Sequence, residues 1–190
     1  MTDADDVVRL KSDPRVAAGV TTVPGETAVR VRPAERADLV SVVRIERASF
    51  PQPWPYDVFA RYLDRPGFLV AVDPEADPTV GDGSVGGVVG HAVADRVRDA
   101  GRTLGHVKNL AVHPDRRGEG VGSTLLSEAL SVLSPAAVKL EVRESNDAAR
   151  SLYGRFGFRP VKRMPRYYDD GEDAVVMVRE PEPEPDPDSD

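Results

Sequence analysis

Residues 113–126 combine three glycines with two arginines, at a point where the hydrophobic pattern changes from a strand to a helix. Residues 107–112 are mostly apolar, and beyond the glycines the apolar residues recur at helical spacing. Gly118, Gly120 and Gly122 allow a tight turn whose N–H groups point inward at the positive end of the helix dipole. The segment therefore predicts a binding site for phosphate.

Three kinds of phosphate-binding turn have to be distinguished. The Walker pattern needs a lysine before Ser or Thr, but Gly122 directly precedes Ser123, and the dinucleotide pattern G-x-G-x-x-G is absent. What remains is Arg-x-x-Gly-x-Gly, which resembles the acetyl-coenzyme A pyrophosphate loop of the GCN5-related N-acetyltransferase (GNAT) superfamily. The alternative is a glycine-rich turn that binds nothing. The resemblance implies cofactor contacts from Arg117, Gly118, Glu119, Gly120, Val121 and Gly122, with Arg116 and Arg117 offsetting the negative charge of Glu119.

The length of 190 residues suits one domain with a full core and leaves little room for a second. No apolar run is long enough to span a membrane, and the acidic N-terminus lacks the basic start of a secretory signal, so we expect a cytoplasmic protein without a membrane partner. The absence of cysteine excludes disulfides, a thiol nucleophile and thiolate metal sites. With only three histidines, we expect no catalytic metal.

The net charge of −7 is concentrated at the C-terminus, where residues 180–190 carry six acidic residues and no basic one. Their alternation with proline predicts an extended, disordered tail whose role is solvation. Residues 1–27 are polar and predicted to be poorly ordered. A single domain is therefore predicted over residues 28–179, and because it carries no long basic face, nucleic acid is not expected as its primary ligand.

Hydrophobic periodicity within this domain predicts the element order βααβββαβαββ. This order indicates an α/β fold of the α+β kind, a GNAT-type domain with a mixed, mostly antiparallel twisted sheet of about seven strands and helices on both faces. The residues from Val138 to Arg143 alternate, which places Glu141 on the polar face of a strand. In the helix that follows, Ala148, Leu152 and Phe156 are predicted to form a buried stripe.

Two long motifs in the C-terminal half carry a closer resemblance. Residues 140–158 resemble the block L-E-V-R-x-S-N-x-x-A-x-x-L-Y-x-x-x-G-F of protein N-terminal acetyltransferases, and residues 167–177 resemble their ending Y-Y-x-D-G-E-D-A-x-x-M. The family is the ribosomal-protein-alanine N-acetyltransferase (RimI) type, together with the archaeal N-terminal acetyltransferases. The resemblance covers Ala28 to about Arg179.

The resemblance implies a role for single residues. It makes Glu141 the general base and Tyr153 the general acid, and it makes Asn146 a cofactor contact. Taken alone, Glu141 would be a solvated strand residue, Tyr153 a packing aromatic beside Leu152, and Asn146 a helix cap. The strand that holds the acetyl and pantetheine portions is implied to be Leu110, Ala111 and Val112.

The groove for the peptide N-terminus is implied to be lined by Phe50, Pro51, Gln52, Tyr167 and Tyr168. Archaeal relatives often have a glutamate where Gln52 stands, so the sequence favours small first residues such as Ala or Ser over methionine. The alternative for this loop is that Trp54 and Phe59 simply pack the first two helices together.

The expected reaction is acetyl transfer from acetyl-CoA to the α-amine of a protein N-terminus, with a ribosomal protein as one candidate substrate. An α-amine has a pKa near 8, whereas a lysine amine at about 10.4 is some 3 kcal/mol harder to deprotonate. Without a cysteine for an acyl-enzyme, direct attack in a ternary complex is preferred. Two alternatives stay open: a small-molecule amine acetyltransferase, and a non-catalytic acetyl-CoA-binding partner of another complex.

Overall fold

The computed structural model of the protein describes residues 29–75, 87–99, 101–133 and 137–181, and the predicted poorly ordered terminus and acidic tail lie almost wholly outside these ranges. Its centre is a seven-stranded sheet in the order β1-β2-β3-β4-β5-β7-β6. The strands are β1 Arg30–Pro33, β2 Phe68–Val72, β3 Val88–Asp99, β4 Arg102–Val112, β5 Val138–Arg143, β6 Arg159–Met164 and β7 Ala174–Arg179. Neighbouring strands are antiparallel except for β4 and β5, which are parallel, so the predicted mixed, mostly antiparallel sheet is confirmed.

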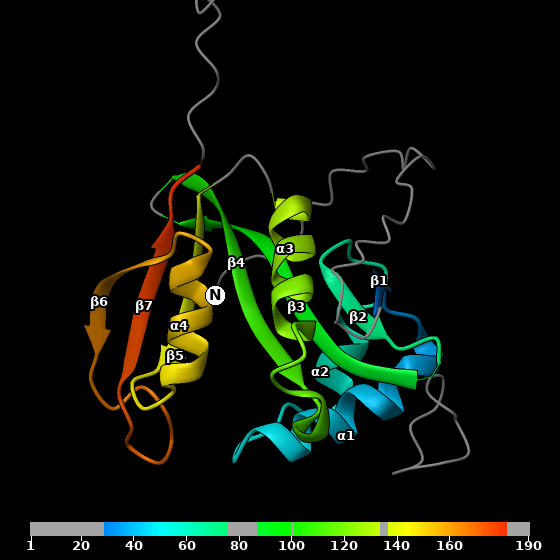
Figure 1. Cartoon of the computed structure of the whole chain (residues 1–190). Coiled ribbons are helices and arrows are strands. Elements are labelled where there is room, and N and C mark those ends of the chain that lie inside the picture. Colours follow the sequence, from blue (N-terminus) through cyan, green and yellow to red (C-terminus); the bar gives the residue numbers. More distant parts are fainter. Residues whose placement is uncertain (1–28, 76–86, 100, 134–136, 182–190) are drawn as a thin grey trace, which may run out of the picture.

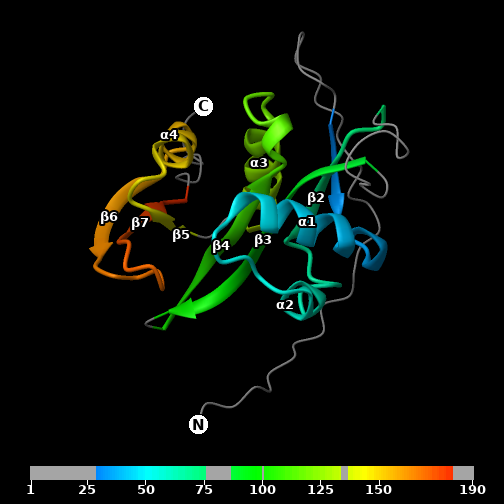
Figure 2. The same cartoon turned by 90° about the horizontal axis from the view of Figure 1, so that it is seen from below.

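Helices cover both faces of this sheet, as the sequence predicts (Figure 1). They are α1 Leu39–Ser49, α2 Tyr56–Ala60, α3 Val121–Leu133 and α4 Asp147–Arg155, with short 3-10 helices at Arg36–Asp38 and Pro114–Arg116. The view from below shows α3 and α4 on one side of the sheet and α2 on the other (Figure 2). Because each side has its own helices, the sheet separates two hydrophobic cores, one containing Leu125 and Leu126 and the other containing Ile45 and Phe59.

The buried face of α4 differs from the prediction. Ala148 is exposed, whereas Tyr153 is buried and Leu152 and Phe156 are partly buried; Ala149 packs with them. Residues spaced strictly by four drift around a helix of 3.6 residues per turn, so a stripe needs both three- and four-residue steps. The observed face therefore includes Tyr153, which the predicted stripe left out.

The two halves of the sheet separate between β4 and β5. These strands pair only at Gly105 with Val138 and at His106 with Lys139. Two residues further along β4, Val93 of β3 pairs with Asn109 while Ala94 pairs with Val107, which leaves Lys108 as a β-bulge. Beyond this point the edge of β4 that faces β5 has no strand partner in the described structure, and its backbone groups can bind an extended ligand.

Candidate active site

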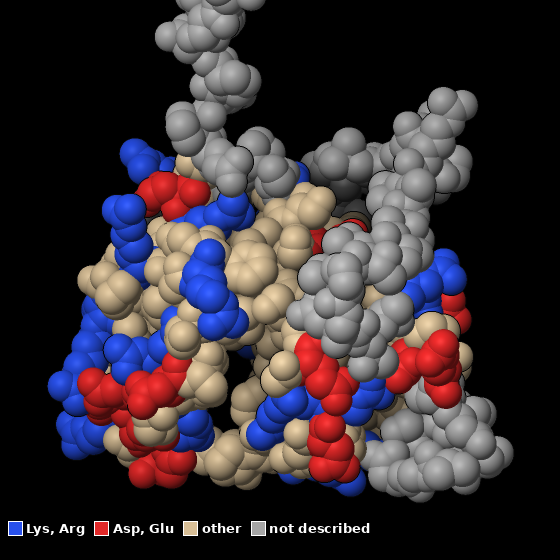
Figure 3. Space-filling model, viewed as in Figure 1, with Lys and Arg blue, Asp and Glu red and all other residues tan. Residues whose placement is uncertain are grey.

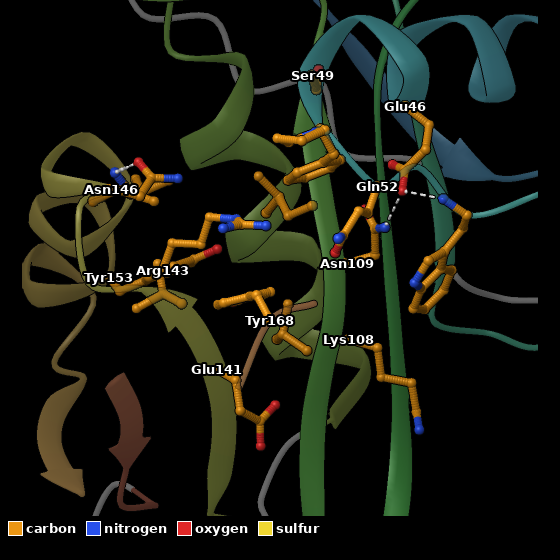
Figure 4. Close-up of a pocket in the computed structure, with 18 residues that line it drawn as sticks. Glu46, Ser49, Gln52, Lys108, Asn109, Glu141, Arg143, Asn146, Tyr153 and Tyr168 are labelled. Carbon is orange, nitrogen blue, oxygen red and sulfur yellow. Dashed lines mark hydrogen bonds between the residues drawn. The ribbon is translucent and has the colours of Figure 1, made fainter. Parts of the chain in front are cut away.

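A cavity of about 270 Å³ opens where β4 and β5 separate. Its walls come from the C-terminal end of α1, the α1–α2 loop, both separated strands, α4 and the loop between β6 and β7 (Figure 4). The predicted site residues that line it are Phe50, Pro51, Gln52, Leu110, Glu141, Asn146, Tyr153 and Tyr168. The space-filling view shows the molecule hollowed between α3 and α4 (Figure 3). Residues predicted to contact the cofactor, to transfer protons and to bind the peptide therefore surround one cavity.

The remaining predicted residues lie outside this cavity. Ala111 is buried against the α1–α2 core, and Val112 packs against the core on the other side of the sheet. Residues 117–122 form the turn that leads from β4 into α3. Tyr167 lines a second cavity on the sheet.

The turn before α3 has the backbone that an anion cradle requires. Gly118 and Gly120 both have φ of +82°, a region that residues with a Cβ rarely adopt, and α3 begins immediately afterwards at Val121. The N-terminus of a 13-residue helix and its unpaired N–H groups favour a phosphate there. This geometry fits the pyrophosphate of coenzyme A.

The two arginines of this turn have different partners. Arg116 pairs with Glu119 at 2.8 Å and with Asp73 at 2.8 Å, so it offsets the negative charge in the turn as expected. Arg117 instead donates to the carbonyl of Val112 at 3.2 Å and to the hydroxyl of Ser49 at 3.1 Å. Arg117 therefore ties the turn to the end of α1.

Glu141 forms a short contact with a residue that the sequence left without a catalytic role. Its Oε2 lies 2.6 Å from Nε2 of His106 on β4, and both side chains are less than one-fifth exposed. Burial raises the pKa of the Glu141 carboxyl, but the hydrogen bond to His106, with the charges of His106, Lys139 and Lys108, outweighs burial and lowers its pKa below the ordinary value. Glu141 is thus ionised at neutral pH.

The register of β4 against β5 brings His106 next to Glu141. His106 pairs with Lys139, and Glu141 is two residues further along on the same face of β5. Only its capacity to bind a metal was weighed from the sequence, because the pairing of β4 with β5 could not be assigned there.

Tyr153 on α4 also lines the cavity and is 8% exposed. Burial raises the pKa of its hydroxyl to about 12, and the neighbouring Tyr168 adds to this rise. With this pKa the hydroxyl is protonated at neutral pH. Within the described residues it makes no hydrogen bond, so it is available to a ligand in the cavity. These are the properties of a general acid.

The α1–α2 loop is held against β4 by Glu46, a buried carboxylate of α1 to which the sequence motifs assign no function. Its Oε1 accepts hydrogen bonds from the backbone N–H of Trp54 at 3.0 Å and from Nδ2 of Asn109 at 2.9 Å. Its Oε2 lies 3.3 Å from Nε2 of His91. Glu46 thus joins the loop that carries the predicted acceptor residues to the strand that carries the predicted donor residues (Figure 4).

The loop between β6 and β7 is held by a second network, centred on Arg143. Its guanidinium contacts Asp170 at 2.8 Å and Glu172 at 2.6 Å, and its Cζ lies 3.9 Å from the centre of the Tyr168 ring. Hydrogen bonds from Ser145, together with Arg143, lower the pKa of Glu172 to about 2. The network fixes Tyr168 at the cavity.

In the ranges that the structure describes, no three His, Cys, Asp or Glu side chains are grouped as a metal site would require. None of the helices there has the length and apolar character needed to cross a membrane.

The chain belongs to the acetyltransferase (GNAT) family, whose model matches residues 39–158. It is 36% identical to an N-alpha-acetyltransferase of Sulfolobus acidocaldarius, over 78% of this chain and 90% of the relative. It is 35% identical to the N-alpha-acetyltransferase RimI of Mycobacterium tuberculosis, over 76% and 88%. The crystal structure of the ribosomal-protein-S18-alanine N-acetyltransferase from Escherichia coli superimposes with a TM-score of 0.62 at 27% identity, covering 81% of this chain and 96% of that one. The protein is therefore an acyltransferase.

Proposed function

We propose that the protein transfers an acetyl group from acetyl-CoA to the α-amine of a protein N-terminus. The observation that carries this proposal is the pair Glu141 and Tyr153. An ionised carboxylate and a protonated phenol line one cavity, at the point where two strands separate. Acetyl transfer to an amine needs both a group that accepts a proton from the amine and a group that donates one to the departing sulfur.

The donor side of the site would hold acetyl-CoA. The turn at residues 117–122 would bind the pyrophosphate, the free edge of β4 at Leu110, Ala111 and Val112 would bind the pantetheine chain, and Asn146 would contact it from α4. Asn146 also caps α4, since its Oδ1 accepts from the N–H of Ala149 at 3.0 Å. When bound, acetyl-CoA supplies the thioester carbonyl as the electrophile.

One residue is available for each of the two proton transfers between substrates and protein. Glu141, directly or through a water, accepts the proton that the α-amine loses as its nitrogen bonds to the acetyl carbon. The contact with His106 holds the carboxylate in place. When the carbon–sulfur bond breaks, the Tyr153 hydroxyl gives its proton to the thiolate. Because the chain has no cysteine, an acyl-enzyme on a thiol is not available.

The acceptor is proposed to be a protein chain that begins with a small residue such as Ala or Ser. The relatives are named for α-amine acetylation, and one structural neighbour for the alanine of ribosomal protein S18, which makes a ribosomal protein a candidate. The α1–α2 loop with Phe50, Pro51 and Gln52, and Tyr168 on the other side, border the cavity as walls of a peptide groove would.

The test is acetylation of synthetic peptides by the purified protein with acetyl-CoA, read by mass spectrometry. Peptides beginning with Ala or Ser should be modified at the α-amine, and the same peptides with a blocked N-terminus and internal lysines should not. A variant with Tyr167 and Tyr168 both replaced by alanine should raise KM for peptide much more than KM for acetyl-CoA. Acetylation confined to lysine side chains or free polyamines would overturn the proposal and favour the small-molecule alternative.

A further inference from the structure

The cavity of the proposed active site is lined by four charged side chains, which are Glu46, Lys108, Glu141 and Arg143. Glu46, Glu141 and Arg143 are each engaged by hydrogen bonds or ion pairs from neighbouring residues. In the part of the chain that the structure describes, Lys108 makes neither a hydrogen bond nor an ion pair. Its ammonium is therefore the charge in this lining that a ligand can still pair with.

The β-bulge in β4 determines the direction of the Lys108 side chain. Val107 packs in the core that contains Leu125, on the α3 side of the sheet. Because side chains alternate along a strand, Lys108 leaves β4 on the opposite face, where α1 lies. Lys108 is the extra residue of the bulge, so Asn109 follows on that same face and bonds to Glu46 of α1. Lys108 thus points to the side of the sheet that carries the proposed peptide groove.

Lys108 also lies across the gap from Glu141. The strands are parallel and pair at His106 with Lys139, so two residues further along each strand Lys108 comes opposite Glu141, where the strands have begun to separate. The charge of Lys108 contributes to the lowered pKa of the Glu141 carboxyl. Figure 4 shows Lys108 extending from β4 away from Glu141. Its ammonium is therefore beside the position proposed for the α-amine of the acceptor, and not at that position.

Binding of an acceptor changes the charge balance of the cavity. The α-ammonium of the acceptor compensates the carboxylate of Glu141 and places a second positive charge near Lys108. Two like charges in a partly buried site repel each other more than they would in bulk water. A carboxylate on the acceptor, next to Lys108, would replace this repulsion by attraction.

The second residue of the acceptor is the first position that can supply this carboxylate. The first residue is proposed to be Ala or Ser, which has no charged side chain. Consecutive Cα atoms are about 3.8 Å apart, so the carboxylate of an acidic second residue can lie roughly 6 or 7 Å from the α-nitrogen. The flexible four-carbon side chain of Lys108 can reach a carboxylate at that distance.

We propose that Lys108 selects acceptor chains whose second residue is Asp or Glu. The inference rests on the proposed function and names its class of acceptor: a protein N-terminus with a small first residue followed directly by an acidic one. In this proposal Lys108 binds the substrate and takes no part in proton transfer.

The test compares three peptides that begin with Ala, carry Asp, Asn or Lys as the second residue and are otherwise identical. The readout is the ratio of kcat/KM for the Asp and Asn peptides, because these side chains have the same shape and general changes in catalysis cancel in the ratio. At low salt the wild type should prefer Asp about 3- to 5-fold over Asn and about tenfold over Lys, and about 0.5 M NaCl should reduce both preferences.

Lys108→Met should lower the ratio of Asp to Asn to about one, and Lys108→Glu should lower it below one. Lys108→Arg keeps the charge and should keep the preference for Asp. Lys162→Met is the matched control, because Lys162 is exposed on β6 and lines only the second cavity, so the ratio should stay at the wild-type value. A wild-type ratio near one, or an equal decrease in Lys108→Met and Lys162→Met, would overturn the inference.

Other results separate this inference from its alternatives. If Lys108→Met slowed all peptides alike and left the ratio unchanged, Lys108 would act only on the charge of Glu141 and the inference would be wrong. A peptide with Asp as the third residue that gained as much as the one with Asp as the second would also contradict it. If no peptide were acetylated at its α-amine, the proposed function itself would fail, whereas equal acetylation of all peptides would sink only the role of Lys108.

Discussion

The proposed donor half of the site, which would bind acetyl-CoA, and the proposed acceptor half, which would bind the peptide, are built in different ways. The donor half is a continuous stretch of chain, from the free edge of β4 through a turn with two glycines at positive φ into α3. The acceptor half is assembled from separate elements that meet through side chains: Glu46 joins α1, the α1–α2 loop and β4, and Arg143 joins β5 to the β6–β7 loop. The donor half depends mainly on backbone conformation, and the acceptor half on long-range polar contacts.

This difference predicts where substitutions act. A change in the donor half should remove binding of the cofactor, because the backbone N–H groups of the turn would themselves bind the pyrophosphate. A change in the network of the acceptor half should raise KM for the peptide and leave the cofactor alone. The residues between the halves, Glu141 and Tyr153, should affect turnover rather than either binding step.

The largest effect is expected from Gly120→Val. The φ of +82° at Gly120 is strained for a β-branched residue, and the new side chain would occupy the space of the phosphate. Calorimetric titration should show no measurable CoA binding. Gly101→Val is the control, since Gly101 has φ of +81° in the hairpin between β3 and β4 with open space around it. Gly101→Val should bind CoA as the wild type does. If Gly120→Val folds and also binds CoA as the wild type does, the turn is not the cofactor site.

Glu141→Gln should lower kcat by about 10²-fold or more while CoA affinity stays nearly unchanged, since the amide keeps the shape but cannot accept a proton. The lowered pKa of Glu141 keeps the wild-type carboxylate ionised above the ordinary carboxyl range, so kcat/KM should rise with pH only as the α-amine deprotonates near pH 8. Raising the pH should partly rescue the variant. Wild-type activity of the variant at pH 7 would mean that another group is the base.

Tyr153→Phe should slow transfer by about 10- to 100-fold with both substrates still bound, because only the hydroxyl is lost. Its pKa of about 12 means that the wild-type hydroxyl stays protonated over the working range, so removal should change the rate without adding a new pH dependence. Steady-state kinetics with separate titration of CoA checks this. A variant whose sole defect is weaker CoA binding would make Tyr153 a packing or cofactor contact instead.

The same difference explains what the sequence could predict. The element order, the mixed sheet and the strand-turn-helix at residues 107–133 could be predicted because they follow from local periodicity and from glycines in one short segment. The sequence could not assign His106 to Glu141, Glu46 to Trp54, or Arg143 to Tyr168, since each pair depends on strand register or on residues far apart in the chain. Ala148 was misplaced for a smaller reason, the drift of a four-residue spacing around the helix.

A smaller effect, confined to the acceptor half, is expected from Glu46→Ala. It leaves the N–H of Trp54 and the amide of Asn109 without their acceptor, so the α1–α2 loop should loosen and KM for peptide should rise by about tenfold. Glu46→Gln is the matched variant, because an amide oxygen can keep both bonds, and it should retain most of the wild-type KM. A rise in KM for acetyl-CoA equal to that for peptide would show that the contact supports both halves alike.

The smallest effect is expected from Glu172→Gln, which removes one of two carboxylates around Arg143 while Asp170 stays in place. KM for peptide should rise about threefold at pH 7, because Arg143 and the loop that carries Tyr168 lose one anchor. The pKa of Glu172 is lowered to about 2 in the folded protein, against about 4.3 for a free glutamate. Its contribution to stability is therefore fully present above pH 4.3 and is lost as the pH falls toward 2. Acid unfolding followed by circular dichroism should show wild type and variant converging over that window. Curves that stay parallel down to pH 2 would mean that the carboxylate of Glu172 does not stabilise the loop.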